Sequence, residues 1–144
     1  MFAALATASA ADAARLTPGE TSLLAAMNHA RAEHGLAPLR VDLTLERAAR
    51  AHSLDMLRRN YFAHGAFASR IIGSGARGPL FGENLAWGSG RYAAPATIVA
   101  EWLASPEHRA NLLHPGFARV GLAAPAGTFR GGPAVVVTAD FAGR

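Results

Sequence analysis

Apolar residues in the first third of the chain recur every three or four positions, which is the spacing of one face of an α-helix. The first such segment opens with a cap at Thr17, has Pro18 in its first turn and carries Glu20 at the capping-box position. The pattern therefore predicts a helix that runs to about His34, where Gly35 is placed to end it.

A second helix is predicted to begin at a cap on Asp42 or Thr44 and to end near Asn60. The apolar residues of this segment share one face with His52, which we expect to be a hydrogen-bonded core histidine rather than a ligand. The charged residues fall on the other face. We therefore expect Glu46 to point to solvent together with the arginines of this segment.

The middle of the chain combines short helical segments with glycine-rich stretches. Residues 67–72 could form one or two helical turns, whereas residues 73–79 have the composition of a loop. A third helix is predicted over residues 94–104. Ser105 followed by Pro106 then repeats the cap-and-proline signal and predicts a short fourth helix.

Beyond Gly116 the period of the pattern changes from that of a helix to that of a strand. Residues 117–123 alternate as a half-buried strand does, and residues 133–141 form the strongest β pattern in the chain. Residues 126–132 between them have turn composition, so we expect an antiparallel hairpin. Helices first and strands last predict an α+β fold in which helices pack on a small sheet.

Length and composition predict a single domain, which we assign to residues 17–144 of the 144. No apolar run approaches the roughly 20 residues that cross a bilayer, so no transmembrane segment is expected. All 14 basic residues are arginine, and the formal net charge is +4. Because these arginines are scattered, the sequence does not indicate a nucleic-acid-binding surface. The chain has no cysteine, which excludes disulfides and thiolate chemistry.

The first residues resemble the end of a secretion signal. They are rich in alanine and contain the A-x-A arrangement Ala8-Ser9-Ala10, which is typical of a cleavage site. The basic segment and the full apolar segment of a complete signal peptide are missing. We interpret residues 1–16 as a signal-peptide remnant or flexible tail, and we expect a secreted, periplasmic or cell-envelope protein.

Glu83 stands out because it lies in an apolar run between glycines. His64, after the second helix, and His108, in the first turn of the fourth, are its candidate partners. Two imidazoles and a carboxylate can form an open metal site or act in general acid–base catalysis. The pattern alone establishes neither function. A glutamate between glycines more often is solvated or caps a turn, and no compact metal-binding motif is present. Near a helix N-terminus His108 is expected to be neutral, which is the form that binds a metal.

Short motifs follow one another in order along most of the chain. They are Met27-Asn28-His29-Ala30-Arg31, Ala51-His52-Ser53-x-Asp55-Met56, Phe62-Ala63-His64, Gly82-Glu83-Asn84-Leu85-Ala86, Trp102-x-x-Ser105-Pro106-Glu107-His108-Arg109, Phe117-x-x-Val120-Gly121-Leu122 and Asp140-Phe141. As an ordered set over residues 20–141 they resemble the CAP superfamily (cysteine-rich secretory proteins, antigen 5 and pathogenesis-related 1 proteins; the SCP domain) in its short bacterial form.

The resemblance implies an α-β-α sandwich, with a small central antiparallel sheet flanked by helices, in a protein that is usually exported. It also implies a cleft lined by two histidines and two glutamates. The first histidine corresponds to His64, the glutamate of the Gly-Glu-Asn motif to Glu83, and the second histidine to His108.

The second glutamate of the family's cleft has no counterpart, because Ser105 occupies its position. Glu101, one helical turn earlier, and Glu107, beside His108, are the two substitutes that the sequence offers. The ligand cleft that we expect is lined by His64, Glu83, His108, Ser105, Glu101 and Asn84, and the metal ligands that we expect are His64, His108 and Glu83.

Three functions are compatible with such a cleft. The leading one is an exported, non-enzymatic binding module that takes a divalent cation such as zinc or a small ligand, including a lipid, or binds a component of the cell envelope. The second is a metal-dependent, peptidase-like hydrolase with Glu83 as the base and a bound water as the nucleophile. In the third the cluster is structural, Glu83 bridges the two histidines, and the surface binds other proteins.

Overall fold

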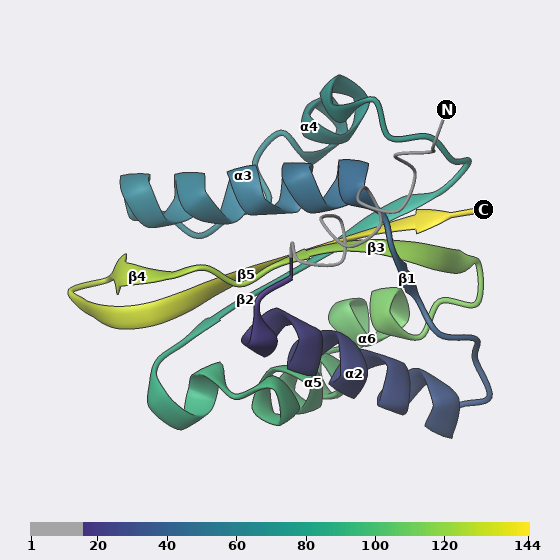
Figure 1. The fold of residues 1–144 in the computed structure, drawn as a ribbon, viewed down its shortest axis with the longest axis horizontal. Coiled ribbons are helices and arrows are strands. Elements are labelled where there is room, and N and C mark those ends of the chain that lie inside the picture. The colour runs from purple at the N-terminus through teal and green to yellow at the C-terminus, as the bar shows by residue number, and fades with distance from the viewer. Residues whose placement is uncertain (1–15) are drawn as a thin grey trace, which may run out of the picture.

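The computed structural model describes residues 16–144, which form a sheet between two groups of helices (Figure 1). The signal remnant expected in residues 1–16 lies, apart from Leu16, outside the described residues and stays a prediction. The helices are α2 (Pro18–Glu33), α3 (Leu43–Arg59), α4 (Phe67–Ser74), α5 (Pro95–Ala104) and α6 (Pro106–Leu112), and a 3₁₀ helix spans Gly90–Ala93. The strands are β1 (Arg40–Val41), β2 (Phe81–Gly88), β3 (Phe117–Ala123), β4 (Ala126–Phe129) and β5 (Gly132–Gly143).

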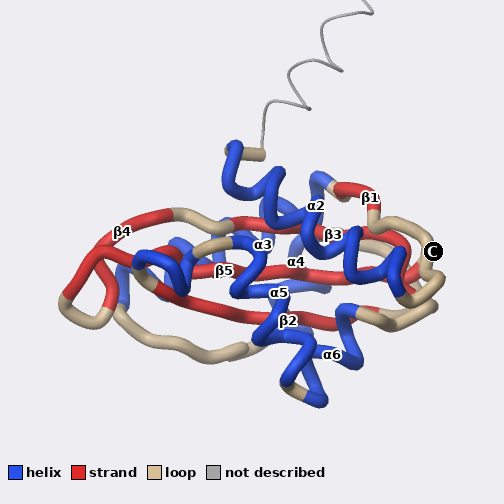
Figure 2. Tube along the Cα trace, turned by 90° about the horizontal axis from the view of Figure 1, so that it is seen from below, coloured by secondary structure: helices blue, strands red, loops and turns tan. Residues whose placement is uncertain are grey.

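Helices cover both faces of the sheet. α3 and α4 lie on one face, and α2, α5 and α6 lie on the other, where the view from below shows them in front of the strands (Figures 1 and 2). The predicted α-β-α sandwich is thus confirmed. Among the helices of residues 16–144, none is both long enough and apolar enough to cross a membrane.

β5 is the central strand of the sheet, whose order is β1-β3-β5-β2, with β4 beside the first half of β5. β5 pairs antiparallel with β2, β3 and β4, and the short β1 runs parallel to β3. The strands predicted in residues 117–123 and 133–141 form and pair as expected. Two expectations were wrong: residues 126–132 contain β4 as well as a turn, and the Glu83 segment, to which no strand was assigned, is β2.

The helix ends follow the cap signals of the sequence. The Thr17 hydroxyl accepts from the backbone N–H of Glu20, and the Glu20 carboxylate accepts from the backbone N–H of Thr17, which completes the capping box. Asp42 caps α3, and Asn60, in the left-handed conformation with a φ of 52°, ends it. The end of α3 at Asn60 determines where the loop of residues 60–66 begins, and this loop forms part of the candidate site.

Glu46 corrects the sequence analysis, because it is buried rather than exposed to solvent. Arg50 donates to Glu46 Oε1 and to Glu20 Oε2, each at 2.8 Å, and Glu20 Oε1 accepts from the backbone N–H of Ala124. A carboxylate tolerates burial when it has such partners. The helical period of α3 could not reveal this cluster, since it depends on the packing of α3 against the sheet and on the contact of Arg50 with Glu20 at the start of α2.

Candidate functional site

Glu83 lies in the middle of β2 and points to the face of the sheet that α4 covers, where its side chain is 2% exposed. The glycine before it is required by packing. A Cβ on Gly82 would lie 2.8 Å from side-chain atoms of both Asn111 and Phe117. The glycines around Glu83 therefore reflect the close approach of other elements to a buried strand, and not the loop that their composition suggests.

The side chains of His64 and Arg70 hold the Glu83 carboxylate. Nδ1 of His64 lies 2.7 Å from Oε1, and Nη2 of Arg70 lies 2.7 Å from Oε2. The same Arg70 nitrogen donates to the backbone carbonyl of His64 at 2.8 Å. Glu83 thus joins the 60–66 loop and α4 to the sheet, and His64 remains at the surface with a side chain that is 55% exposed.

Asp140 is a second carboxyl group of this cluster. It stands opposite Glu83 in the register of β5 and β2, and it is fully buried. Neither of its side-chain oxygens has a hydrogen-bond partner among the described residues. Burial, and then the neighbouring Glu83 carboxylate, raise the pKa of Asp140 to about 9, although Arg70 acts in the opposite direction. Asp140 is therefore protonated at neutral pH.

His108 lies in the first turn of α6, and the hollow that it lines includes neither His64 nor Glu83. Its Nδ1 lies 2.9 Å from the hydroxyl of Ser105, which precedes α6. Burial, followed by the nearby charge of His64, lowers the pKa of His108 below its ordinary value. The direction of this shift favours the neutral imidazole that the sequence analysis expected, but its causes are burial and His64, and the helix dipole stays an expectation.

Asn84 lies on the other face of β2 and does not point into the cleft. Its amide nitrogen donates to the backbone carbonyl of His108 at 2.9 Å, and its carbonyl oxygen accepts from Asn111 at 3.0 Å. Asn111 also donates to the backbone carbonyl of Glu83. Asn84 therefore acts on the site by fixing α6, and with it His108, against β2.

A hollow of about 320 Å³ lies beside the outer strand of the sheet, between the 60–66 loop and the junction of α5 and α6. Glu101, Ser105 and His108, which the sequence assigned to the cleft, contribute to its wall. The remaining lining residues are Phe62, Leu85, Ala86, Trp87 and Trp102. Trp87 and Glu101 also border a neighbouring hollow of about 360 Å³ that reaches Tyr92. We call this region the β2 cleft.

The side chains as they lie do not fit a metal ion. In residues 16–144 no group of three His, Asp or Glu side chains is arranged so that it could hold one. Glu83 has both oxygens engaged, one of them by the permanently charged guanidinium of Arg70, which repels a cation. A zinc ion bound by His64, Glu83 and His108 would require this pairing to change, and zinc binding stays a prediction.

Two residues of the cluster were missed from sequence. Arg70 falls in a short segment that was assigned only a helical period, and nothing in its neighbourhood indicates its contact with Glu83. Asp140 carried a signal, since it is the one charged residue in the apolar run of residues 133–141. A charged residue at a strand position that should be buried is a candidate site residue.

The profile of the cysteine-rich secretory protein family, CAP, matches residues 24–141. Among curated proteins, the chain is 35% identical over 108 residues to the uncharacterized protein YkwD of Bacillus subtilis, which covers 72% of this chain and 41% of the relative.

Solved structures give a concordant result. An extracellular protein containing an SCP domain from Bacillus anthracis is similar with a TM-score of 0.72 and 26% identity, over 90% of this chain and 44% of that one. An outer surface protein from Borrelia burgdorferi has a TM-score of 0.67 and 21% identity, over 85% of this chain and 90% of that one. The chain thus spans less than half the length of the two Bacillus relatives.

Proposed function

Since the chain belongs to the cysteine-rich secretory protein (CAP) family, we propose that it is a non-enzymatic binding module whose ligand site is the β2 cleft. The ligand is a small molecule with an apolar part and a polar end. The β2 cleft supports this proposal, because it combines an aromatic wall with convergent polar groups, as small-molecule sites do.

The two ends of the β2 cleft suit different parts of a ligand, one apolar and one polar. Phe62 from the loop and Trp87 from β2 offer apolar surface to a chain or ring. His108 and Ser105 form a polar pair at the junction of the helices, where the neutral imidazole keeps Nε2 for a ligand while Nδ1 contacts the hydroxyl. A lipid-like molecule with a hydroxyl or carboxyl end meets both requirements.

A location outside the cytoplasm is part of the proposal. The similar Bacillus anthracis protein is described as extracellular, and the similar Borrelia burgdorferi protein as an outer surface protein. These descriptions belong to the neighbours, and they support the same location for this chain.

Hydrolysis receives less support than binding. A hydrolase would use Glu83 as its base, but both oxygens of this carboxylate are already engaged by His64 and Arg70. A general base must also be within reach of the proton that it removes, and the Glu83 side chain is only 2% exposed. The structural hypothesis agrees with the structure better than hydrolysis does in one respect, since Glu83 holds the 60–66 loop to the sheet. It differs in the partners, because Glu83 bridges His64 to Arg70 and not to His108.

Intrinsic fluorescence offers a direct test, because the only two tryptophans of the chain, Trp87 and Trp102, both line the cleft. We would titrate the protein with decanoate below its critical micelle concentration and with decanol below its solubility limit, and follow the emission. Saturable changes are expected, with affinity reduced at least about tenfold in His108→Ala, the effect of losing one good hydrogen bond to a charged or polar group.

His29→Ala is the matched control, because His29 is an exposed histidine on α2 outside the cleft lining. It should bind these probes as the wild type does. The proposal fails if neither probe gives a saturable signal, or if His29→Ala and His108→Ala weaken binding equally.

A further inference from the structure

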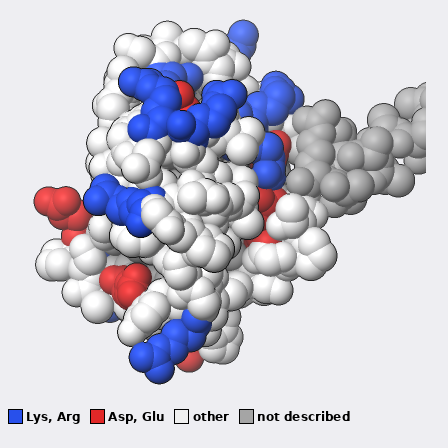
Figure 3. All heavy atoms as spheres, turned by 90° about the vertical axis from the view of Figure 1, so that its left-hand side faces the viewer, with Lys and Arg blue, Asp and Glu red and all other residues white. Residues whose placement is uncertain are grey.

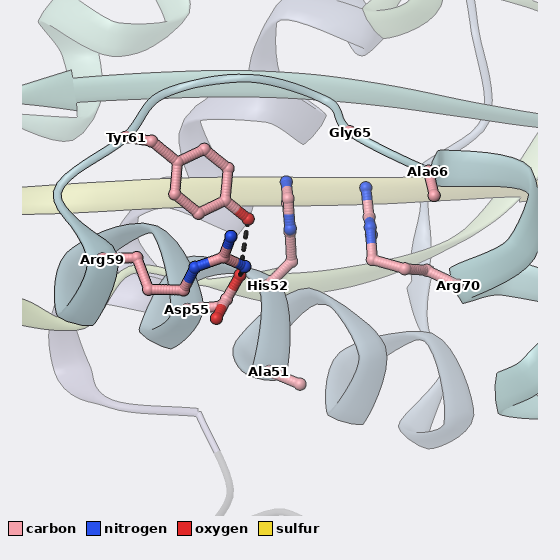
Figure 4. Close-up of a pocket in the computed structure, with 8 residues that line it drawn as sticks. All are labelled: Ala51, His52, Asp55, Arg59, Tyr61, Gly65, Ala66 and Arg70. Atoms are coloured by element: carbon pink, nitrogen blue, oxygen red, sulfur yellow. Dashed lines mark hydrogen bonds and ion pairs between the residues drawn. The ribbon is translucent and has the colours of Figure 1, made fainter.

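A second hollow, of about 420 Å³, lies beneath the 60–66 loop on its other side (Figure 4). It shares no lining residue with the β2 cleft. Consecutive residues of the loop serve the two sites, since Tyr61 borders this hollow and Phe62 borders the cleft. We call it the loop pocket, and nothing in the proposed function above uses it.

Cationic side chains from two helices border the loop pocket. Arg59 comes from the last turn of α3, and Arg70 comes from α4. In Figure 4 the guanidinium of Arg70 and the ring of His52 point in the same direction, into the space below the loop. His52 is a buried, hydrogen-bonded histidine as predicted, with Nε2 at 2.9 Å from the carbonyl of Ala63.

Arg70 has donors that the protein does not satisfy. Its Nη2 serves Glu83 and the carbonyl of His64, whereas its Nε and Nη1 are buried and have no hydrogen-bond partner among the described residues. Nearly all buried donors in proteins are paired, so two unpaired nitrogens of a guanidinium in a residue that borders a cavity favour an acceptor at that place. A guanidinium has no acceptor of its own, and a negatively charged oxygen is its strongest partner.

The charged residues that line the loop pocket favour an anion, although Glu83, which lies outside the lining, already pairs with Arg70. Asp55 is the only acidic residue in its lining, and its carboxylate is already taken by the hydroxyl of Tyr61 at 2.6 Å and by Arg59 at 3.1 Å. The exposed Arg58 adds a further positive charge at the same end of α3. Figure 3 shows cationic side chains gathered in the upper part of the molecule at this end.

The rim of the loop pocket also carries the start of α4. Ala66 is the N-cap of this helix, the N–H of Phe67 donates to the carbonyl of Gly65, and no side chain caps the N–H groups that follow. Free N–H groups at a helix N-terminus favour negative charge, which agrees with the preference of the two arginines.

We propose that the loop pocket binds an oxyanion group, the phosphate or carboxylate of a small molecule, through Arg70 and Arg59. The oxygen atoms of the group accept from the free donors of Arg70, and the start of α4 completes the site, whereas Tyr61, whose hydroxyl donates to Asp55, forms part of the wall. Water would satisfy the same donors without selecting for charge, and the experiment separates the two cases.

The test uses the whole chain, with inorganic phosphate and acetate as probes and chloride at matched ionic strength as the reference. ¹⁵N-edited NMR follows the Nε–H resonances of the arginines. Phosphate or acetate should shift the Arg70 and Arg59 resonances saturably, whereas chloride should not. The stronger of the two probes tells whether a phosphate or a carboxylate is the natural group.

Arg59→Gln and Arg58→Gln form a matched pair of variants. Each removes one charge from the exposed end of α3, but only Arg59 borders the loop pocket. Arg59→Gln should weaken binding about tenfold, the equivalent of one charge-assisted hydrogen bond, whereas Arg58→Gln should stay within about twofold. The Arg59 side chain is 71% exposed, so this variant should fold normally.

Arg70→Lys provides the second variant, since it keeps the charge but loses Nε and the fork of donors. It should reduce the binding of the probe by a similar factor. Absence of a saturable shift with both oxyanions would mean that the pocket holds water only and would overturn the proposal. Equal weakening by Arg58→Gln and Arg59→Gln would also overturn it, because the attraction would then belong to the general surface charge.

Discussion

Glu83 and Asp140 face each other across β2 and β5 as a pair of buried carboxyl groups, only one of which has hydrogen-bonding partners among the described residues. The partners of Glu83 stabilise its charge, whereas Asp140 has none there and keeps its proton. Two adjacent carboxylates in such a site cannot both ionise without a large cost. The pair therefore divides the roles of anion and neutral acid between two neighbouring strands.

This division makes stability depend on pH through Asp140, whose pKa is raised to about 9. The folded protein keeps the proton up to that pH, and the unfolded chain releases it near pH ~4. Between these values the folded state binds more protons, so the contribution of Asp140 to stability falls as pH rises, by at most about 1.4 kcal/mol per pH unit. In Asp140→Asn this dependence disappears.

Urea unfolding of wild type and Asp140→Asn at about pH 5, 7 and 8.5 checks the prediction. The free energy of unfolding of the variant relative to wild type should increase at each step. Glu20 and Asp42 act in the opposite sense, because their lowered pKa values give stability that is lost as pH falls, but they are present in both proteins and cancel. A difference between the two proteins that does not change with pH would contradict the prediction.

Replacing Glu83 by glutamine tests the structural role of the cluster. The substitution removes the charge that balances Arg70 and weakens the contact with His64, and it should lower the free energy of unfolding by roughly 1–3 kcal/mol. Glu33→Gln is the control, since Glu33 forms only an exposed pair with His29 and its loss should be neutral. Equal stability of Glu83→Gln and wild type in urea would show that the carboxylate is not a structural link.

The elements that were predicted correctly are those whose signals are local. The caps at Thr17 and Asp42 determine where α2 and α3 begin, and the period of apolar residues does the rest. β2 was missed because its two faces are both buried and its glycine at position 82 is required by Asn111 and Phe117, which lie far along the chain. No local pattern carries that information.

The contacts of the candidate site also differ in whether the sequence indicates them. The contact of His64 with Glu83 agrees with the set of residues that the sequence motifs select. The contacts of Glu83 with Arg70 and Asp140 depend on the orientation of α4 and on the register of β2 with β5, which sequence spacing does not determine. The burial of Arg31, whose guanidinium donates to four backbone carbonyls, was equally hidden.

Two glycine substitutions should have opposite effects on stability. A Cβ on Gly121 would lie 2.0 Å from the backbone of Leu45 in α3, so Gly121→Ala forces the helix off the sheet and should prevent stable folding. Gly73 lies inside α4 with open space around it, and Gly73→Ala should stabilise by about 0.5–1 kcal/mol through its helix propensity. Thermal unfolding followed by circular dichroism measures both. A folded Gly121→Ala with the wild-type melting temperature would contradict the backbone contact.

Zinc binding should be limited by Arg70, whose guanidinium occupies one oxygen of Glu83. In wild type this positive charge lies beside the carboxylate and opposes the binding of a zinc ion to Glu83. Arg70→Gln removes the competing cation and leaves the candidate ligands His64, Glu83 and His108 in place. Calorimetry on metal-stripped protein should therefore show tighter zinc binding by the variant than by wild type.

The same titration decides which residues hold the metal. Adding His64→Ala and His108→Ala to the Arg70→Gln protein should abolish the gain, because zinc needs at least these imidazoles beside the carboxylate. His29→Ala in the same background should have no effect, since this histidine lies on α2 and pairs with Glu33 at the surface. Equal zinc affinity of wild type and Arg70→Gln would mean that Glu83 is not a zinc ligand, because a ligand freed from a competing cation must bind more tightly.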